Sequence, residues 1–218
     1  MVRRKIPAGQ VNRRNNQTIE QIKTLMEDLG QKYSIKVGIL QTKGGSNIVP
    51  GTGLSMADLG AVHEFGANIN HPGGQPYFIN SNTGMAVFVS KNSFYGQYLI
   101  SKGQVTKPHQ INIPARSFLR EPILGAKGRK EIEKAIENNI PEYAKDLEEN
   151  TVTKIMDELV HDVAENALLQ VQKAFYNDSI KPPTKEISKK MRKYNPQAPT
   201  LVDTGQLQKS ISYEIKKV

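Results

Sequence analysis

The stretch YSIKVGIL (Tyr33–Leu40) decides the fold, because it is the clearest strand signal in the sequence. Its apolar residues Ile35, Val37 and Ile39 stand at every second position, which is the pattern of a strand with one buried face. The last stretch, SISYEIKK (residues 210–217), has the same alternation. Each strand needs a partner for its backbone groups. We therefore expect the two stretches to pair in a small antiparallel sheet.

Apolar residues recur at helical spacing before and after the middle of the chain, and this spacing predicts two helices. Apolar residues recur at helical spacing from Thr18 to Leu29, which predicts an amphipathic helix. A second apolar stripe runs from Leu147 to Phe175, and together with the residues back to about Pro141 it predicts one helix of about 35 residues, roughly 50 Å long. Pro141 either breaks the helical segment before it or opens this helix. The expected fold class is α+β, with the small antiparallel sheet packed against the N-terminal helix and the long helix.

The middle of the chain predicts an insertion. Ser55 is a candidate N-cap for a short helix, and Gly66 is its expected stop. Residues 67–113 are rich in Gly, Pro, Asn and Ser, and PYFI, MAVFVS and QYLIS within them resemble short strands. We predict an inserted β-hairpin or flap at about 67–113 within a single domain of residues 17–218, preceded by a mobile basic arm of residues 1–16.

The net charge of +9 is concentrated at the two ends of the chain. Residues 1–14 contain five basic residues and no acidic one, and residues 181–218 contain nine Lys or Arg against three Asp or Glu. Basic ends commonly contact nucleic acid or an acidic partner surface, and they also occur as solvated arms. The candidate contacts to DNA or to a partner in the arm are Arg3, Arg4, Lys5, Arg13 and Arg14.

Composition excludes several classes of protein. The chain has no cysteine, so disulfides, thiolate metal sites and cysteine catalysis are excluded. No apolar run approaches the roughly 20 residues that span a bilayer, and the N-terminal charges precede no apolar signal region. We expect no membrane association.

The sequence does not match the catalytic and ligand-binding motifs that it partly resembles. His63-Glu64 would need a second histidine at position 67 to form the zinc motif of metalloproteases, and that position is Ala67. The stretch PGTGLS lacks the Lys-Ser/Thr pair of a phosphate-binding loop, and no G-x-S-x-G nucleophile elbow occurs. We therefore expect no catalytic site, no metal and no cofactor.

Three segments, in this order, resemble head–tail joining proteins of tailed bacteriophages, a family of neck and tail-completion proteins. They are GAVHEFG (Gly60–Gly66), IPARSFLREPI (Ile113–Ile123) and LVDTGQLQKSISYEI (Leu201–Ile215). Each is short, and they cover about 33 of 218 residues. The resemblance implies a non-enzymatic virion protein, made in the bacterial cytoplasm, that forms a six-fold homo-oligomeric ring at the head–tail junction. Its implied neighbours are connector or adaptor proteins and tail-terminator or tail-tube proteins, and DNA passes through the ring.

The residues of these motifs have structural or interface roles in this interpretation. Phe65 is expected to end a helix against the core, and Phe118 is expected to pack. Glu64 is expected to pair with Arg116, within or between subunits. The complete set of structural and interface candidates is Glu64, Phe65, Gly66, Pro114, Arg116, Phe118, Asp203, Thr204 and Gly205.

Two other functions remain open. The first is a DNA-binding accessory protein that uses its basic termini. Because these ends contain few aromatic residues for stacking bases, they would contact phosphates and so bind without sequence preference. The second is a hydrolase with an unusual motif around His63 or Glu64, which nothing in the sequence favours.

Overall fold

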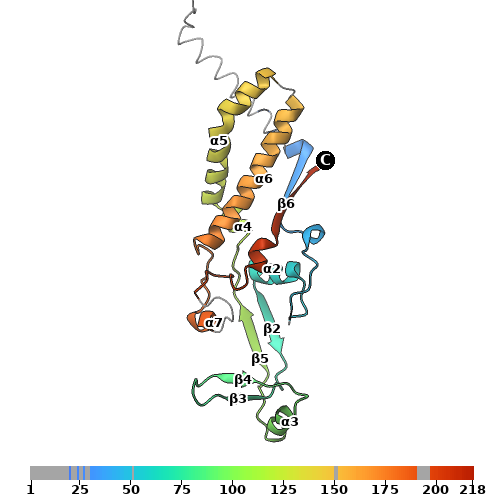
Figure 1. The fold of residues 1–218 in the computed structure, drawn as a ribbon, viewed down its shortest axis with the longest axis vertical. Coiled ribbons are helices and arrows are strands. Elements are labelled where there is room, and N and C mark those ends of the chain that lie inside the picture. Colours follow the sequence, from blue (N-terminus) through green and yellow to red (C-terminus); the bar gives the residue numbers. More distant parts are fainter. Residues whose placement is uncertain are drawn as a thin grey trace, which may run out of the picture. The chain divides into compact units, whose positions relative to one another are not determined.

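The computed structural model describes residues 30–50, 52–149, 152–190 and 197–218, together with Glu20, Thr24 and Glu27. The chain divides into two compact units (Figure 1). Unit 1 contains the described residues up to Glu64 and from Arg116 to Val218, and unit 2 is Phe65–Ala115. The arm of residues 1–16, with all five of its basic candidates, and the apolar residues of the helix expected from Thr18 to Leu29 lie outside the described residues.

The sheet of unit 1 confirms the predicted strand pairing. Strand β1 (Tyr33–Ile39) runs antiparallel to β6 (Ile211–Lys217), with Ile35 opposite Ile215 and Val37 opposite Tyr213. Residues that lie opposite each other project from the same face. Ile35 and Ile215 therefore share one face, and both pack against the helices of unit 1.

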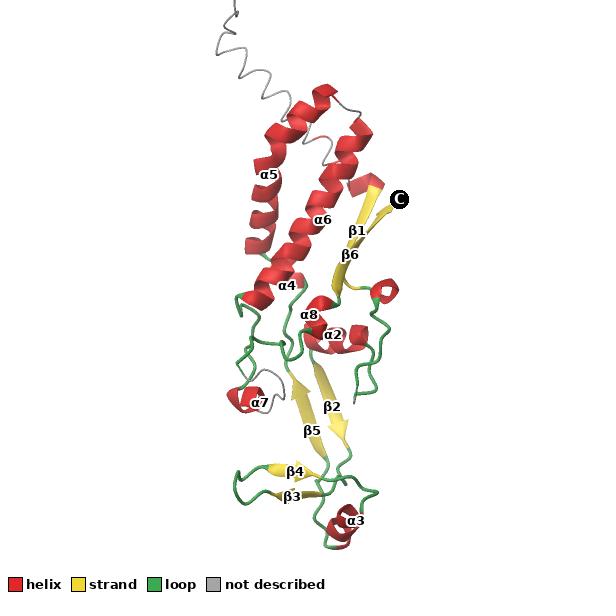
Figure 2. Ribbon diagram, in the orientation of Figure 1, coloured by secondary structure: helices red, strands yellow, loops and turns green. Residues whose placement is uncertain are grey.

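Those helices form a pair, which corrects the prediction of a single helix of about 35 residues. Helix α5 (Ala126–Glu149) and helix α6 (Val152–Tyr176) lie side by side in unit 1 (Figure 2). Their shared core contains Ile136 and Tyr143 from α5 and Ile155, Met156, Leu159 and Val160 from α6. Because two faces pack against each other, the apolar stripe belongs to two helices. The two roles expected for Pro141, a break or a helix start, are both wrong, because Pro141 lies inside α5.

The remaining elements of unit 1 are short. They are η1 (Gln41–Lys43), α2 (Met56–Phe65), α4 (Arg120–Leu124), α7 (Glu186–Lys190) and α8 (Gln206–Lys209). The Ser55 hydroxyl accepts the N–H of Asp58 at 3.1 Å, and the Asp58 carboxylate accepts the N–H of Ser55 at 3.3 Å. This reciprocal pair is a capping box, and it confirms Ser55 as the cap that starts α2.

Unit 2 contains two small antiparallel sheets and one helix. Strand β2 (Ala67–His71) pairs with β5 (His109–Ile113), and β3 (Tyr77–Ile79) pairs with β4 (Ala86–Phe88). The β3–β4 pair corresponds to the strands expected in PYFI and MAVFVS.

The strand expected in QYLIS is wrong, because those residues belong to helix α3 (Phe94–Ser101). The Ser93 hydroxyl accepts the N–H of Gly96 at 3.0 Å and caps this helix. Leu99 is buried on its inner side. The cap and the burial of Leu99 together favour a helix over a strand.

Candidate functional site

The carboxylate of Glu64 joins the first two sequence motifs inside unit 1. Its atom Oε1 accepts the Ser117 hydroxyl at 2.7 Å, the N–H of Arg120 at 3.2 Å and Nε of Arg120 at 3.0 Å. Its atom Oε2 accepts the N–H of Leu119 at 2.9 Å. Glu64 is only 3% exposed, so these bonds replace the water that the carboxylate loses on folding.

These contacts determine the charge state of Glu64. Burial by itself raises the pKa of the Glu64 carboxyl, but the hydrogen bonds from Ser117, Leu119 and Arg120 outweigh burial and hold the pKa below its ordinary value. The side chain is therefore an anion at neutral pH. It caps the backbone N–H groups that begin the short helix α4, which is the role of a fixed structural anion.

The position of Glu64 explains why Phe65 does not pack in the core. The buried residues of α2 are Met56, Gly60 and Glu64, which recur every four residues and form the inner face. Phe65 is turned away from that face and is 64% exposed. The prediction that Phe65 ends the helix against the core is wrong, and the residue that does so is the glutamate beside it.

The predicted pairing of Glu64 with Arg116 is also wrong within the chain. The ion pair forms with Arg120, at 3.0 Å. The Nε atom of Arg116 instead donates to the backbone carbonyl of Pro182 at 2.9 Å, and its backbone N–H donates to the carbonyl of His63 at 2.7 Å. Arg116 thus connects the end of α2 to the segment that follows α6.

Sequence reasoning missed Ser117 and Arg120, although both lie in the second motif. Arg120 is the first residue of α4, and Ser117 lies three residues before it. A buried carboxylate that caps a helix accepts hydrogen bonds from N–H and O–H groups at the start of that helix. Their place at the start of α4 is what points to these two residues, whereas charge type alone pointed to Arg116.

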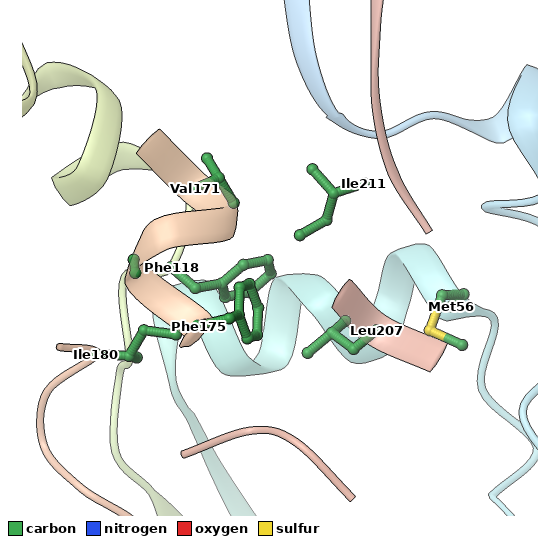
Figure 3. Close-up of a cluster of buried hydrophobic side chains, with 8 residues drawn as sticks. Met56, Phe118, Val171, Phe175, Ile180, Leu207 and Ile211 are labelled. Carbon is green, nitrogen blue, oxygen red and sulfur yellow. The ribbon is translucent and has the colours of Figure 1, made fainter. Parts of the chain in front are cut away.

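The second and third motifs meet in one apolar core, shown in Figure 3. Phe118 is fully buried, and its ring meets that of Phe175 edge to face with centroids 5.6 Å apart. Leu207 and Ile211, from the third motif, belong to the same cluster. Met56, at the start of α2, belongs to the same cluster and lies next to Leu207 (Figure 3).

Gly66, at the end of the first motif, lies in unit 2 beside the start of the second. Its φ is +74°, and a Cβ atom there would lie 2.8 Å from the backbone N of Ala115 and the carbonyl O of Ile113. Only glycine fits this left-handed position without moving the backbone. Pro114 is exposed and directly follows β5.

The Asp203-Thr204-Gly205 stretch begins α8. Gly205 is the N-cap residue, with a left-handed φ of +74°, and the hydroxyl of Thr204 accepts the N–H of Gln206 at 3.3 Å. The Thr204 hydroxyl therefore contacts the first residue of α8. The turn leads α8 directly into β6, so it sets where the last strand begins.

A cavity of about 640 Å³ in unit 1 lies where the three motifs approach one another. His63 and Arg116 line it together with Asp203, Thr204 and Gly205. Among the described residues, Nδ1 of His63 is buried and has no hydrogen-bond partner. Burial lowers the pKa of His63, and the charge of Arg116 lowers it further, so the ring is neutral at pH 7. A neutral imidazole beside a fixed cation suits a packing or hydrogen-bonding role.

Within the described part of the chain, no three His, Asp or Glu side chains gather as metal ligands, and no helix is long and apolar enough to cross a membrane. Comparisons with protein-family models, with curated proteins and with solved structures found no match. The site is therefore interpreted from its own geometry and from the three motifs that meet in it.

Proposed function

We propose that this chain is a structural subunit of a ring at the junction between the capsid and the tail of a tailed bacteriophage. The observation that carries the proposal is that the three motifs meet in unit 1. Glu64 of the first motif holds the backbone of the second, and Phe118 of the second packs with Leu207 and Ile211 of the third. Glu64 and Leu119 are more than 50 residues apart in the sequence, and Phe118 and Leu207 are more than 80 apart. These distant segments thus form one connected part of unit 1. Their contact supports treating the three short resemblances as a single one.

A non-enzymatic role is part of the proposal. The most buried acid of the site, Glu64, has its oxygens occupied by donors from Ser117, Leu119 and Arg120 and has a lowered pKa. A general base needs a pKa near the working pH and a free lone pair directed at the substrate. The pKa of the Glu64 carboxyl is lowered, which moves it away from neutral pH, and its partners suit a support for the backbone.

The ring would form through heterologous contacts repeated around a six-fold axis. The resemblance implies a connector or adaptor protein on the capsid side, a tail-terminator or tail-tube protein on the other, and a lumen that DNA crosses. The basic arm with Arg3, Arg4, Lys5, Arg13 and Arg14 would contact neighbouring proteins or the DNA backbone.

The proposal is tested by removing the gene from a phage that encodes this chain. A nonsense mutation in the gene is expected to leave filled heads and separate tails in electron micrographs, and the intact gene supplied from a plasmid restores joined particles. Joined and infectious particles in the complete absence of the protein would contradict the proposal.

The alternative, a DNA-binding accessory protein, is favoured by the charge of the two ends. It predicts tight duplex binding by the isolated protein that falls steeply with salt, because each neutralised phosphate releases counterions. The ring subunit predicts weak binding. Fluorescence anisotropy with a random-sequence duplex, on the full chain and on a chain lacking residues 1–16, separates the two functions.

A further inference from the structure

Unit 2 differs sharply from the rest of the chain in composition. Residues 65–115 contain none of the 21 acidic residues, and their only charged side chains are Lys91, Lys102 and Lys107. The same 51 residues contain seven of the 14 Phe and Tyr residues. Enrichment in aromatic residues together with depletion of charge is the signature of a protein–protein interface.

Helix α3 contains three of these seven aromatic residues, and two of them lie on its outer side. Leu99 faces inward and is buried, and Phe78 of β3 meets Tyr95 of α3 with ring centroids 5.8 Å apart. On the outer side, Phe94 and Tyr98 are one turn apart, and their exposed fractions are 93% and 50%.

Tyr95, which is 46% exposed, lies between the inward side of α3 and the outer side. The rings of Tyr95 and Tyr98 stack with centroids 6.1 Å apart, and the Lys102 ammonium lies 5.7 Å from the centre of the Tyr98 ring. We call Phe94, Tyr95, Tyr98 and Lys102 the α3 face. It is an exposed set of aromatic rings that ends in one cation, and aromatic anchors of this kind dominate binding energy at interfaces.

A surface of matching chemistry lies on α6 in unit 1. Glu158, Glu165, Leu169 and Tyr176 follow one another at spacings of seven, four and seven residues, so they form one stripe along the helix. Leu169 is 42% exposed and Tyr176 is 84% exposed. We call these four residues the α6 stripe.

The α6 stripe offers apolar groups at one end and carboxylates at the other. Glu158 is bridged to Lys154 at 3.7 Å and Glu165 accepts the Tyr213 hydroxyl at 3.3 Å, so both are held in place at the surface. Because unit 2 has no acid, a second α3 face cannot neutralise Lys102, whereas an acidic stripe can.

We propose that the α3 face of one copy of this chain docks onto the α6 stripe of a second copy. Phe94 and Tyr98 would pack on Leu169 and Tyr176, and Lys102 would lie near the stripe's carboxylates. The two surfaces differ, so the contact is heterologous and repeats from copy to copy, which is the type of contact that closes a ring. This inference rests on the proposed ring and names the surfaces that build it.

Two double variants test the contact by sedimentation velocity of the full chain. Phe94→Ser with Tyr98→Ser removes the α3 face and keeps the α6 stripe, and Leu169→Ser with Tyr176→Ser does the reverse. All four side chains are exposed, and circular dichroism checks that each variant is folded. Ile48→Ser is the matched control, because Ile48 is an exposed apolar residue (63%) outside both surfaces.

The wild-type chain and the Ile48→Ser control are expected to form assemblies larger than a dimer. Each double variant alone is expected to be a monomer. An equimolar mixture of the two double variants is expected to form one-to-one pairs and nothing larger, because each partner retains one complementary surface.

Three results would overturn the inference: a monomeric wild-type chain at every concentration, assembly of either double variant to the wild-type size, or no pairing in the mixture. A labelled oligothymidine strand is added in parallel. If the wild-type chain stays monomeric and binds this strand through Phe94 and Tyr98, the α3 face belongs to single-stranded nucleic acid instead. Any of these results leaves the virion role standing, because that role is tested separately by the phage lacking the gene.

Discussion

The Oε2 atom of Glu64 accepts the backbone N–H of Leu119 at 2.9 Å, across 55 residues of sequence. A carboxylate that is almost fully buried thereby positions the backbone of another segment. The other acceptor atom holds Ser117 and Arg120, so one side chain fixes a whole turn. Glu64 therefore links the end of α2 to the start of α4.

Glu64→Gln should lower the free energy of unfolding by about 1–3 kcal/mol. The amide keeps the size of the side chain, but its NH₂ group faces one of the N–H donors and leaves it unsatisfied. The matched control is Glu186→Gln, because Glu186 is 79% exposed in an i,i+3 pair with Lys189 and should change stability by less than about 0.5 kcal/mol. Urea denaturation followed by circular dichroism measures both changes, and equal effects of the two substitutions would contradict the role given to Glu64.

Stability should depend on pH through Glu64. Its pKa in the folded protein is lowered from the ordinary value, so the unfolded chain binds the proton more tightly. The stabilisation is therefore fully present above the ordinary pKa of 4.5 and is lost as the pH falls through the lower folded pKa. The stability difference between the wild type and Glu64→Gln should shrink between pH 7 and pH 3 in urea titrations. A difference that stays constant over this range would count against an ionised Glu64.

The ion pair should be assigned to Arg120 and not to Arg116. In a double-mutant cycle, Glu64→Gln and Arg120→Gln are expected to couple by up to about 1 kcal/mol, because the Arg120 side chain is 58% exposed and water screens the pair. The cycle with Arg116→Gln is the control and should show a smaller coupling, since Arg116 binds the carbonyl of Pro182. Stronger coupling to Arg116 would restore the pairing expected from the sequence.

Phe118→Ala should be among the most damaging single substitutions in unit 1. Phe118 is fully buried against Phe175, and deletion of a buried phenyl ring costs about 3–5 kcal/mol. Leu124→Ala, at a side chain that is 56% exposed on α4, is the control and should cost far less. Thermal unfolding of both variants measures the contrast, and similar midpoints would show that the cluster in Figure 3 is not the core of this unit.

Gly66→Ala should destabilise unit 2 more than Gly84→Ala. Both glycines have positive φ, +74° and +66°, so both substitutions introduce backbone strain of about 1–2 kcal/mol. Only at Gly66 would the new Cβ also overlap the backbone of Ile113 and Ala115, since nothing lies within 4 Å at Gly84. Hydrogen exchange of the β2 and β5 amides should therefore accelerate in Gly66→Ala beyond its rate in Gly84→Ala. Equal rates would remove the steric argument.

The sequence was sufficient where one local signal decides the structure. Alternation predicted that the strand with Ile35 pairs with the strand that contains Ile215, and Ser55 was recognised as a helix cap. The sequence was insufficient where contacts between distant segments determine the structure. The apolar stripe before Tyr176 is equally compatible with one helix or two, and only the contacts between α5 and α6 separate them.

The candidate site shows the same division. The three motifs identified the segments that meet, but charge type alone could not select the partner of Glu64. The choice depends on the start of α4, which orients two N–H groups and the Arg120 side chain toward the carboxylate. The exposed Phe94 and Tyr98 gave no sequence signal, because the strand predicted for QYLIS concealed the helix that presents them.

The most direct test of the central claim is quantitative mass spectrometry of purified phage particles. If the chain is a ring subunit of the head–tail junction, it is found in joined particles at a fixed copy number that matches a small ring, and it stays with them through a density gradient. Absence of the chain from joined, infectious particles would contradict the account.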